Sequence, residues 1–315
     1  MPYQRQYPDP VFMFGALRSG TTLLRLMLIQ HSQIHSPGEA DYLFEHLSPD
    51  PAAPGGWAFD IEALKSDWKF GLADVDLPEG VAGGDLVHAL GDVIGAAAPD
   101  KIATVSVHRC APAMASLYPH AKVIHLLRDP RDSARSVVSM GWDGNSYYGA
   151  RHWQDTETGW DLAGIPESQV LTIRFEDLMQ DLEKGLTRIC DFLGLEFEPG
   201  MLEYHRTSTY GPPDPSMSQK WRKQARPREI ALIEGRVGPL LQARGYVPEG
   251  APVVPSGPEK LWLKIDNVLN RWKFNARYYG PGLWASHHLA RLLRLKPLAD
   301  RLAASQMEIM IKNLK

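Results

Sequence analysis

The stretch that most constrains the fold is FGALRSGTTLLRLML, residues 14–28, which joins a strand end, a glycine-rich turn and an apolar helix. Gly15 and Gly20 enclose four residues, and a turn of this kind directs backbone N–H groups and the positive end of the helix dipole at one point. A nucleotide triphosphatase would carry lysine at Thr21, whereas this loop carries Arg18, whose planar guanidinium suits a phosphate or sulfate. The sequence therefore predicts an anion-binding loop made of Arg18, Ser19, Gly20, Thr21 and Thr22.

Four short apolar runs predict buried strands, at residues 10–15, 101–108, 121–127 and 168–175. Helical patterns follow three of them, at residues 21–31, 129–140 and 176–194. Strands that alternate with helices indicate a parallel sheet covered on both faces, with ligands at the carboxyl ends of the strands. We therefore expect an α/β fold, a three-layer sandwich with a central parallel sheet.

A second arginine follows a strand end in RDPRDSARS, residues 128–136. Asp129 can cap the next helix, Pro130 suits its first position, and Arg128 then stands at a helix N-terminus. Arg128 and Ser136 are therefore candidates to hold a second phosphate. The alternative is that Arg128 forms a salt bridge with Asp132 and only frames the fold.

Residues 48–100 are partly loop-like and predict an insertion that caps the site within a domain spanning residues 1–250. Residues 141–153 predict a loop with exposed aromatic side chains. The aromatic residues of these two segments suit a sugar, a lipid-linked group or a polycyclic acceptor, or else belong to the core; they are Trp57, Trp68, Trp142, Tyr147, Tyr148 and Trp153.

A basic extension follows a Pro/Gly-rich linker predicted at residues 246–260. Residues 251–315 contain 11 Lys and Arg and 4 Asp and Glu, a net charge of +7, and residues 282–302 match an amphipathic helix. Three interpretations remain open for this predicted helical extension: packing on the core, a contact in a homo-oligomer, or peripheral attachment to anionic lipid.

The overall composition narrows the class of protein. The net charge of -3 gives no reason to expect a nucleic-acid partner, and two cysteines, Cys110 and Cys190, make neither a disulfide framework nor a zinc site. The N-terminal residues lack the apolar region of a signal peptide, and no apolar run is long enough to span a membrane. We expect a cytoplasmic protein.

These motifs together resemble the sulfotransferases that use 3′-phosphoadenosine 5′-phosphosulfate (PAPS). RSGTT (18–22) is similar to their 5′-phosphosulfate loop, RDPRDSARS (128–136) to their 3′-phosphate motif, and SQKWRK (218–223) to their nucleotide-covering loop. The stretch RFEDLMQDLEKGLTRICDFLGLEFEPGML (174–202) resembles the segment after their later central strand. The resemblance covers residues 10–246 and is nearest to the tyrosylprotein and bacterial branches.

The resemblance implies a PAPS-dependent O-sulfotransferase (EC 2.8.2.-) that needs no metal and releases 3′-phosphoadenosine 5′-phosphate (PAP). It implies nucleotide contacts from the two arginine motifs and from the covering loop, where the candidates are Ser218, Lys220, Trp221 and Arg222. Phe175 departs from the tyrosylprotein branch, which has a tyrosine there, so a hydroxyl contact would be lost.

The resemblance also implies a general base, and Glu39, about twenty residues beyond Arg18, is our first candidate. The Pro–Gly pair before it predicts a turn back to the strand ends. Rival bases are Asp41, Glu45, His46 and His108. Many relatives carry a lysine near His108 that stabilises the transferring group; here Arg109 is the available charge.

We expect the acceptor to be a hydroxyl of a carbohydrate, a lipid-linked group or a small molecule. A tyrosylprotein sulfotransferase is the alternative, although the catalytic part of the chain is acidic overall, which disfavours an acidic peptide. Two alternatives of another class are a P-loop small-molecule kinase and a non-catalytic nucleotide-binding protein.

Overall fold

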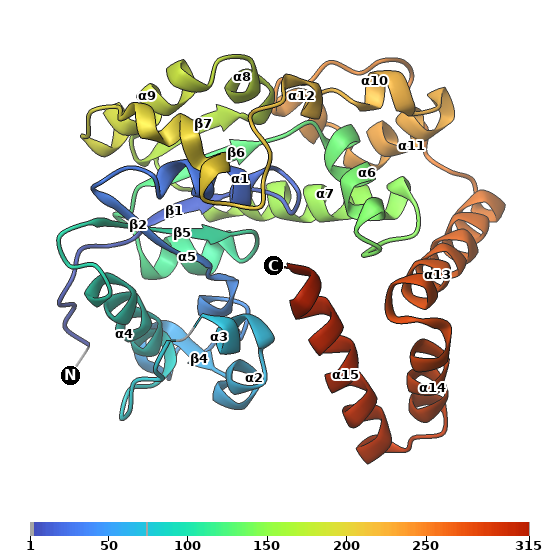
Figure 1. Cartoon of the computed structure of the whole chain (residues 1–315), viewed down its shortest axis with the longest axis horizontal. Helices are drawn as coiled ribbons and strands as arrows, with labels where there is room; N and C mark the ends of the chain where they lie inside the picture. The colour runs from blue at the N-terminus through green and yellow to red at the C-terminus, as the bar shows by residue number, and fades with distance from the viewer. Residues whose placement is uncertain (1–2, 74, 315) are drawn as a thin grey trace.

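The computed structural model describes residues 3–73 and 75–314. Five parallel strands form one sheet in the order β2-β5-β1-β6-β7 (Figure 1). The strands are β1 (Val11–Phe14), β2 (Ile34–Glu39), β5 (Ile102–Val107), β6 (Val123–Leu127) and β7 (Val170–Arg174). This arrangement confirms the predicted α/β fold and its parallel sheet.

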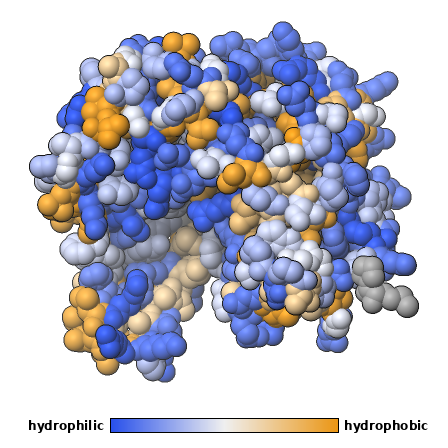
Figure 2. Space-filling view, turned by 180° about the vertical axis from the view of Figure 1, so that it is seen from behind, coloured by the Kyte–Doolittle hydropathy of each residue, from blue (hydrophilic) through white to orange (hydrophobic). Residues whose placement is uncertain are grey.

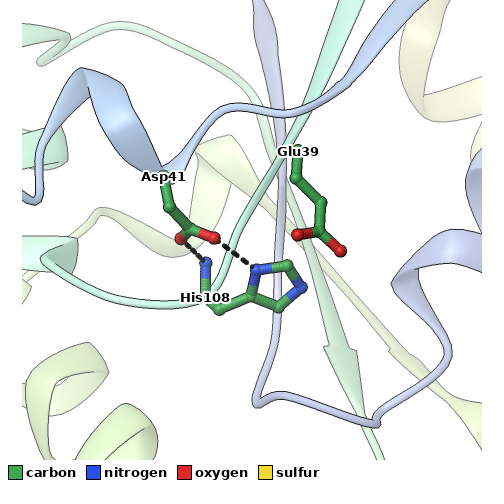
Figure 3. Close-up of side chains that lie close together, drawn as sticks. All are labelled: Glu39, Asp41 and His108. Atoms are coloured by element: carbon green, nitrogen blue, oxygen red, sulfur yellow. Dashed lines mark hydrogen bonds and ion pairs between the residues drawn. The ribbon is translucent and has the colours of Figure 1, made fainter. Parts of the chain in front are cut away.

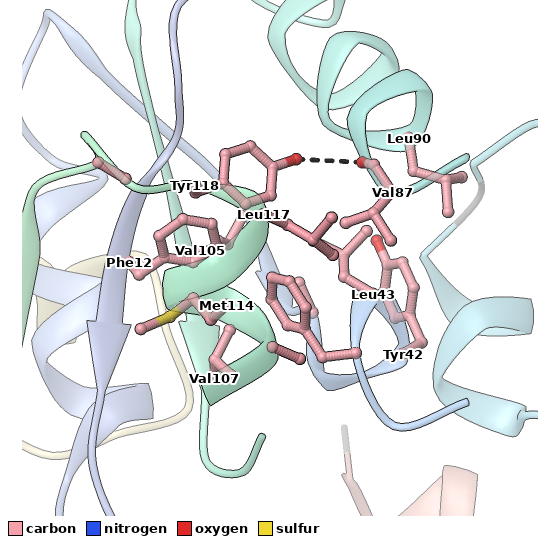
Figure 4. Close-up of a cluster of buried hydrophobic side chains, with 14 of the residues drawn as sticks. Phe12, Tyr42, Leu43, Val87, Leu90, Val105, Val107, Met114, Leu117 and Tyr118 are labelled. Carbon is pink, nitrogen blue, oxygen red and sulfur yellow. Dashed lines mark hydrogen bonds between the residues drawn. The ribbon is translucent and has the colours of Figure 1, made fainter. Parts of the chain in front are cut away.

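Alternate residues of the strands point into two apolar layers, because a parallel sheet between helices is buried on both faces. Met13 of β1 packs with α1 (Thr21–Leu28), α8 (Phe175–Gln180) and α9 (Leu182–Leu193). Phe12 and Phe14 face the other way, towards α4 (Gly83–Ala96) and α5 (Ala111–Leu117). Figure 4 shows this second layer around Phe12 and Tyr118, whose hydroxyl donates to the Val87 carbonyl. Each fully buried Phe or Leu contributes about 1.5–3 kcal/mol.

A third apolar cluster lies among helices, of which α6 (Pro130–Ser139) and α11 (Pro227–Val237) stand beyond the carboxyl ends of the strands (Figure 1). It joins α6, α7 (Ser146–Ala163) and α11 through Ala134, Trp153 and Ile233. Asp129 caps α6 by accepting from the Arg131 N–H group, as predicted from its place before Pro130. The cluster fixes α6 and the residues before it at the sheet edge where parallel α/β sheets usually bind ligands.

Shorter elements complete the structure. They are the hairpin β3 (Leu47–Pro49) and β4 (Trp57–Phe59), and helices α2 (Ile61–Lys65), α3 (Trp68–Leu72), α10 (Trp221–Gln224) and α12 (Leu240–Ala243). Within the segment 48–100, residues 83–96 form α4, which packs its leucines into the core.

Three local predictions were wrong. Residues 34–39 form the edge strand β2 rather than a turn, and the register with β5 shifts between His35 and Gly38, around Pro37. The helix expected over 176–194 is broken at Asp181, which caps α9, although the chain does end that helix at Gly194 in a left-handed conformation. The loop expected over 141–153 ends at Asn145, which caps α7 by accepting from the Tyr148 N–H group.

Three helices form the C-terminal segment: α13 (Gly257–Tyr279), α14 (Pro281–Leu292) and α15 (Lys296–Leu314). α13 begins inside the predicted linker and meets the body through Asn267, whose side-chain oxygen accepts from the Gly144 N–H group at 2.6 Å. The single helix predicted over 282–302 is two helices, because the chain turns at Arg294, which has a left-handed φ of 55°. Among the described helices, none is both long enough and apolar enough to cross a bilayer.

Candidate active site

The glycine-rich loop has a geometry that few residues other than glycine tolerate. Gly20 has φ 100° at the N-cap of α1, and a Cβ there would lie 2.6 Å from the Phe175 ring. Arg18 also has a positive φ, 71°, which is uncommon for a residue with a side chain and recurs at functional sites. The loop closes with a hydrogen bond from the Ser19 N–H group to the Ala16 carbonyl at 3.0 Å. Phe175 therefore packs directly on the glycine-rich loop.

The two arginine motifs meet at the sheet edge. Arg18 Nε donates to Ser136 Oγ at 3.0 Å, and the Arg18 guanidinium carbon lies 5.8 Å from the centroid of a Trp142 ring. Arg128 Nη1 donates to the Arg18 carbonyl at 2.9 Å, and Nη2 donates to the Met217 carbonyl at 2.8 Å. The structure thus brings Arg18, Arg128 and Ser136 together from the loop, the end of β6 and α6.

Arg128 has no anionic partner in the described part of the chain, where no carboxylate lies within ion-pair distance of it. The alternative of a salt bridge to Asp132 is wrong, because Asp132 instead accepts the Trp221 N–H group at 2.9 Å. Burial lowers the pKa of Arg128, with Asp132 and Glu176 opposing that shift.

Several buried polar atoms of the two motifs lack partners among the described residues: the donors Arg128 Nε, Ser19 Oγ and Ser133 Oγ, and the acceptor Asp132 Oδ2. A buried guanidinium with free donors is costly unless an anion completes it. These donors fit a phosphate-bearing ligand at this edge of the sheet.

Trp221 is a structural residue in this conformation rather than a surface for an adenine to stack on. It is 1% exposed, its Nε1–H group donates to Asp129 at 3.0 Å, and the Arg131 guanidinium lies 3.8 Å from its ring centroid. Arg222 lies 4.4 Å from the same ring. A ring enclosed in this way has no free face for stacking in this conformation, and a nucleotide contact by Trp221 stays a prediction.

The other residues of the covering loop are closer to solvent. Ser218 Oγ donates to the Pro215 carbonyl at 2.8 Å, and Lys220 Nζ lies 3.0 Å from Met217 Sδ. Arg222 is exposed and pairs with Glu249 at 3.2 Å. Met217 links this loop to Arg128, so the loop lies beside the second anion motif. Nucleotide binding by Ser218, Lys220 and Arg222 stays a prediction.

A buried hydrogen-bonded chain runs from the sheet edge to the glycine-rich loop. His108, which follows β5, places Nδ1 2.8 Å from Asp41 Oδ2 and Nε2 2.9 Å from Thr21 Oγ1, and its N–H group donates to Asp41 Oδ1 at 2.7 Å. Burial opposes the charged imidazole, but the attraction and hydrogen bond of Asp41 outweigh it and raise the pKa of His108. Burial likewise opposes the Asp41 carboxylate, but His108 and then Lys69 hold the pKa of Asp41 well below its usual range.

Glu39 is the exposed member of this cluster. It ends β2, and its carboxylate points towards the His108 ring (Figure 3). The carboxylate and ring atoms of Glu39, Asp41 and His108 lie within 4.8 Å of one another, a spacing that metal ligands also have. Both His108 nitrogens already have partners in Asp41 and Thr21, so the arrangement favours a hydrogen-bonded chain over a metal site.

Lys69 is a site residue that the sequence reasoning missed. It extends from α3, and its Nζ lies 3.4 Å from Asp41 Oδ2 and 3.2 Å from Glu45 Oε2. Burial opposes its charge, but Asp41 and Glu45 raise the pKa of Lys69. Arg109 is exposed and lies 3.6 Å from Glu45. The only signal for Lys69 in the sequence was its place in the segment expected to cap the site.

A pocket of about 400 Å³ adjoins this cluster, lined by Leu17 of the glycine-rich loop, by Arg109 and by Arg151, His152 and Thr156 of α7. Thr156 Oγ1 donates to the His108 carbonyl at 2.9 Å, so the pocket wall and the buried chain share a backbone segment.

The aromatic residues predicted to bind an acceptor are dispersed. Trp142 is exposed beside Arg18, whereas Trp153 is buried and its Nε1–H group donates to the Arg128 carbonyl. The guanidinium carbon of Arg236 lies 4.8 Å from the centroid of the Tyr147 ring. Trp153 therefore belongs to the core.

His46, which the sequence analysis named as a rival base, pairs with Asp67 at 2.9 Å.

Known proteins resemble this chain in sequence and in fold. The model of the sulfotransferase family matches residues 10–199. Protein-tyrosine sulfotransferase A of Caenorhabditis elegans is 24% identical over 304 residues, covering 83% of this chain and 73% of that protein.

Two solved structures share the fold. The sulfotransferase domain from the curacin biosynthetic pathway gives a TM-score of 0.57 at 20% identity, covering 78% of this chain and 99% of that chain. The sulfotransferase domain from the Synechococcus PCC 7002 olefin synthase gives a TM-score of 0.51 at 23% identity, covering 74% of this chain and 98% of that chain. The match over residues 10–199 spans the glycine-rich loop, the second arginine motif and the cluster at the end of β5, and this chain belongs to the sulfotransferase family of enzymes.

Proposed function

We propose that this enzyme transfers a sulfuryl group from PAPS to a hydroxyl of a carbohydrate, lipid-linked or small-molecule acceptor, with Glu39 as general base. The observation that carries the proposal is the exposed Glu39 carboxylate, within 4.8 Å of His108, at the edge of the sheet that holds the glycine-rich loop. A general base must reach the proton of the acceptor, and geometry decides this before pKa does. His108 is 2% exposed and has both nitrogens occupied, which makes it a weaker candidate.

Family membership implies PAPS as the co-substrate, and the residues present fit it. The N–H groups of residues 19–22 and the hydroxyls of Ser19 and Thr21 would hold the 5′-phosphosulfate, since Ser19 Oγ is buried without a partner among the described residues. Arg128 and Ser136 would hold the 3′-phosphate. Arg18 would serve either group, because its side chain already contacts Ser136.

When bound, PAPS supplies the sulfuryl group: the acceptor oxygen forms the new O–S bond, the S–O bond to the phosphate breaks, and PAP leaves. Glu39 would take the proton of the acceptor hydroxyl. The raised pKa of His108 favours an imidazolium whose Nε2–H group donates to Thr21. The Thr21 hydroxyl proton is then free to point at the departing phosphate, and a preorganised donor of this kind contributes about 3 kcal/mol.

The basic groups near Glu39 would stabilise charge on the transferring sulfuryl group. Lys69 lies 3.4 Å from Asp41 in the same cluster and is less exposed than Arg109. We therefore assign to Lys69 the role for which the sequence offered only Arg109.

The pocket beside Leu17 supports an acceptor of modest size, since about 400 Å³ holds one or two rings. A peptide tyrosine is the second candidate, supported by two observations. The C. elegans relative is a protein-tyrosine sulfotransferase, and Arg109 and Arg151 line the pocket together with one carboxylate, Asp155, which lies 3.9 Å from Arg151; the remaining positive charge would suit an acidic peptide.

The test is a transfer assay with sulfur-labelled PAPS and a panel of acceptors: glycosides, a lipid-linked sugar, phenols and an acidic tyrosyl peptide. Calorimetry with PAP and with ATP, both without metal, accompanies it. We expect PAP to bind more tightly than ATP and label to enter a glycoside, lipid-linked or phenol acceptor. Label only in the tyrosyl peptide supports the second candidate, and ATP binding as tight as PAP binding rejects the site assignment.

A further inference from the structure

The three C-terminal helices carry a charge that the protein itself does not neutralise. Residues 260–312 contain ten Lys and Arg, all of them exposed, and within the described chain none of the ten forms an ion pair. Some arginines of the body are neutralised within the chain: Arg131 pairs with Asp129 and Glu234, and Arg244 pairs with Glu157. The excess positive charge of this segment therefore faces solvent.

The same helices expose apolar side chains. Of the eighteen large apolar side chains exposed in the part of the chain that the structure describes, eleven lie between residues 261 and 298. On α13 they recur at helical spacing, at Leu261, Ile265, Leu269 and Trp272. Figure 2 shows apolar residues on the lobe that these helices form at the lower left, separated by a hollow from the body.

The turn between α14 and α15 combines both features. Leu292, Leu293, Leu295 and Leu298 are 68, 59, 47 and 46% exposed. Beside them, a pocket of about 500 Å³ between the two helices is lined by His287, Arg291, Arg294, Lys296 and Asp300. A basic pocket next to a leucine surface suits a molecule with an anionic head and an apolar body.

We propose that α13–α15 form a docking surface for a bilayer of anionic lipid, with the α14–α15 pocket receiving a headgroup phosphate. Exposed leucines and tryptophans beside unpaired Lys and Arg are the composition of helices that lie in a membrane interface. A symmetric contact between two such segments would bring together two net charges of +7, which disfavours a second copy of this chain as the occupant. The inference does not depend on the acceptor or on the base of the proposed reaction.

The test is co-flotation of the full chain with vesicles of phosphatidylcholine, and with vesicles that also contain phosphatidylglycerol. We expect binding to the anionic vesicles, weaker binding as salt rises, and little binding to phosphatidylcholine alone. The variant with Arg291→Gln, Arg294→Gln and Lys296→Gln should bind about a hundredfold more weakly, since each basic side chain at an anionic surface is worth about fivefold.

A matched control removes the same charge elsewhere: Lys101→Gln, Lys184→Gln and Arg188→Gln, three exposed side chains outside α13–α15. The control should bind as the wild type does, and thermal melting checks that both variants fold. A second variant, Leu292→Ser with Leu293→Ser, should lose about tenfold without any change of charge.

Three outcomes would overturn the proposal: no binding to anionic vesicles, equal losses in the test and control variants, or binding that is insensitive to the leucines. Sedimentation velocity tests whether a second copy of the chain occupies the surface instead. A dimer that the leucine substitutions dissociate, together with absent vesicle binding, would assign the surface to a second copy of the chain.

Discussion

Replacing Asp41 by asparagine tests the buried chain between β5 and the glycine-rich loop. Asparagine keeps the shape of the side chain. Its oxygen can still accept from the backbone N–H group of His108, which in the wild type lies 2.7 Å from Asp41 Oδ1. Its amide then faces Nδ1, so the ring must lose its Nδ1 proton, with Nδ1 accepting from the amide and Nε2–H still donating to Thr21. The hydrogen bonds survive this substitution, whereas the charge pair does not.

The cost of Asp41→Asn follows from burial. Asp41 is 1% and His108 2% exposed, and removing one partner of a buried charge pair costs about 3–5 kcal/mol. Because the hydrogen bonds persist, we expect the free energy of unfolding to fall by about 3 kcal/mol, the lower end of that range.

The loss should depend on pH. The Asp41 contribution is present above the ordinary carboxyl pKa of 3.8 and is lost as pH falls through its lowered pKa. The His108 contribution is present below the ordinary pKa of 6.5 and is lost as pH rises through its raised pKa. The difference between wild type and variant is therefore largest between these two ordinary values and shrinks at higher pH.

Urea denaturation at several pH values measures the difference, and NMR titration of the His108 imidazole measures the pKa directly. In the variant the pKa of His108 should fall below 6.5, because burial remains and the carboxylate is gone. Asp143→Asn, which breaks another Asp–His pair, at 2.9 Å from His152, should leave the His108 titration unchanged. A wild-type pKa at or below 6.5, or a stability loss that is constant with pH, would refute the reasoning.

Three further substitutions test other parts of the site. Gly20→Ala should cost about 1–3 kcal/mol of unfolding free energy and weaken PAP binding, because φ is 100° and the new Cβ meets the Phe175 ring; unchanged denaturation and calorimetry would contradict this. Arg128→Met should weaken PAP binding about tenfold to a hundredfold without lowering stability, since a buried charge without a carboxylate partner is removed; calorimetry and denaturation together check both halves, and a large loss of stability would speak for a framing role. Lys69→Met should raise the pKa of Asp41, so on acidification the variant should begin to lose stability at a higher pH than the wild type. Urea denaturation at acid pH that gives the same pH dependence for both proteins would count against the Lys69–Asp41 contact.

The sequence predicted those parts of the fold that depend on local patterns. Residues 11–14 are a continuous apolar run, and residues 123–127 are apolar apart from His125, because both faces of central strands are buried. β2 escaped notice because IHSPGE is polar, contains Pro37 and Gly38, and lies at an edge where a register shift tolerates both.

The site was predictable only where it follows the chain. Arg18 and Arg128 each sit at a strand end, so their motifs could be read locally, and parallel strands bring such ends to one edge. Lys69 reaches Asp41 through a tertiary contact across 28 positions, which no spacing rule reports. The enclosure of Trp221 likewise depends on Asp129, far away in sequence.

Glu39→Gln in the sulfuryl-transfer assay tests the central assignment most directly, with PAP affinity measured on the same protein. The amide cannot accept the proton, so kcat should fall by about 10²–10⁴-fold while the Kd for PAP stays unchanged, because Glu39 is not among the groups proposed to hold the nucleotide. Glu45→Gln, a neighbouring carboxylate that pairs with Lys69 and Arg109, is the matched control and should keep most of the activity. Full turnover by Glu39→Gln would contradict the account, and an equal loss in both variants would show that charge around Lys69, rather than proton transfer to Glu39, limits the reaction.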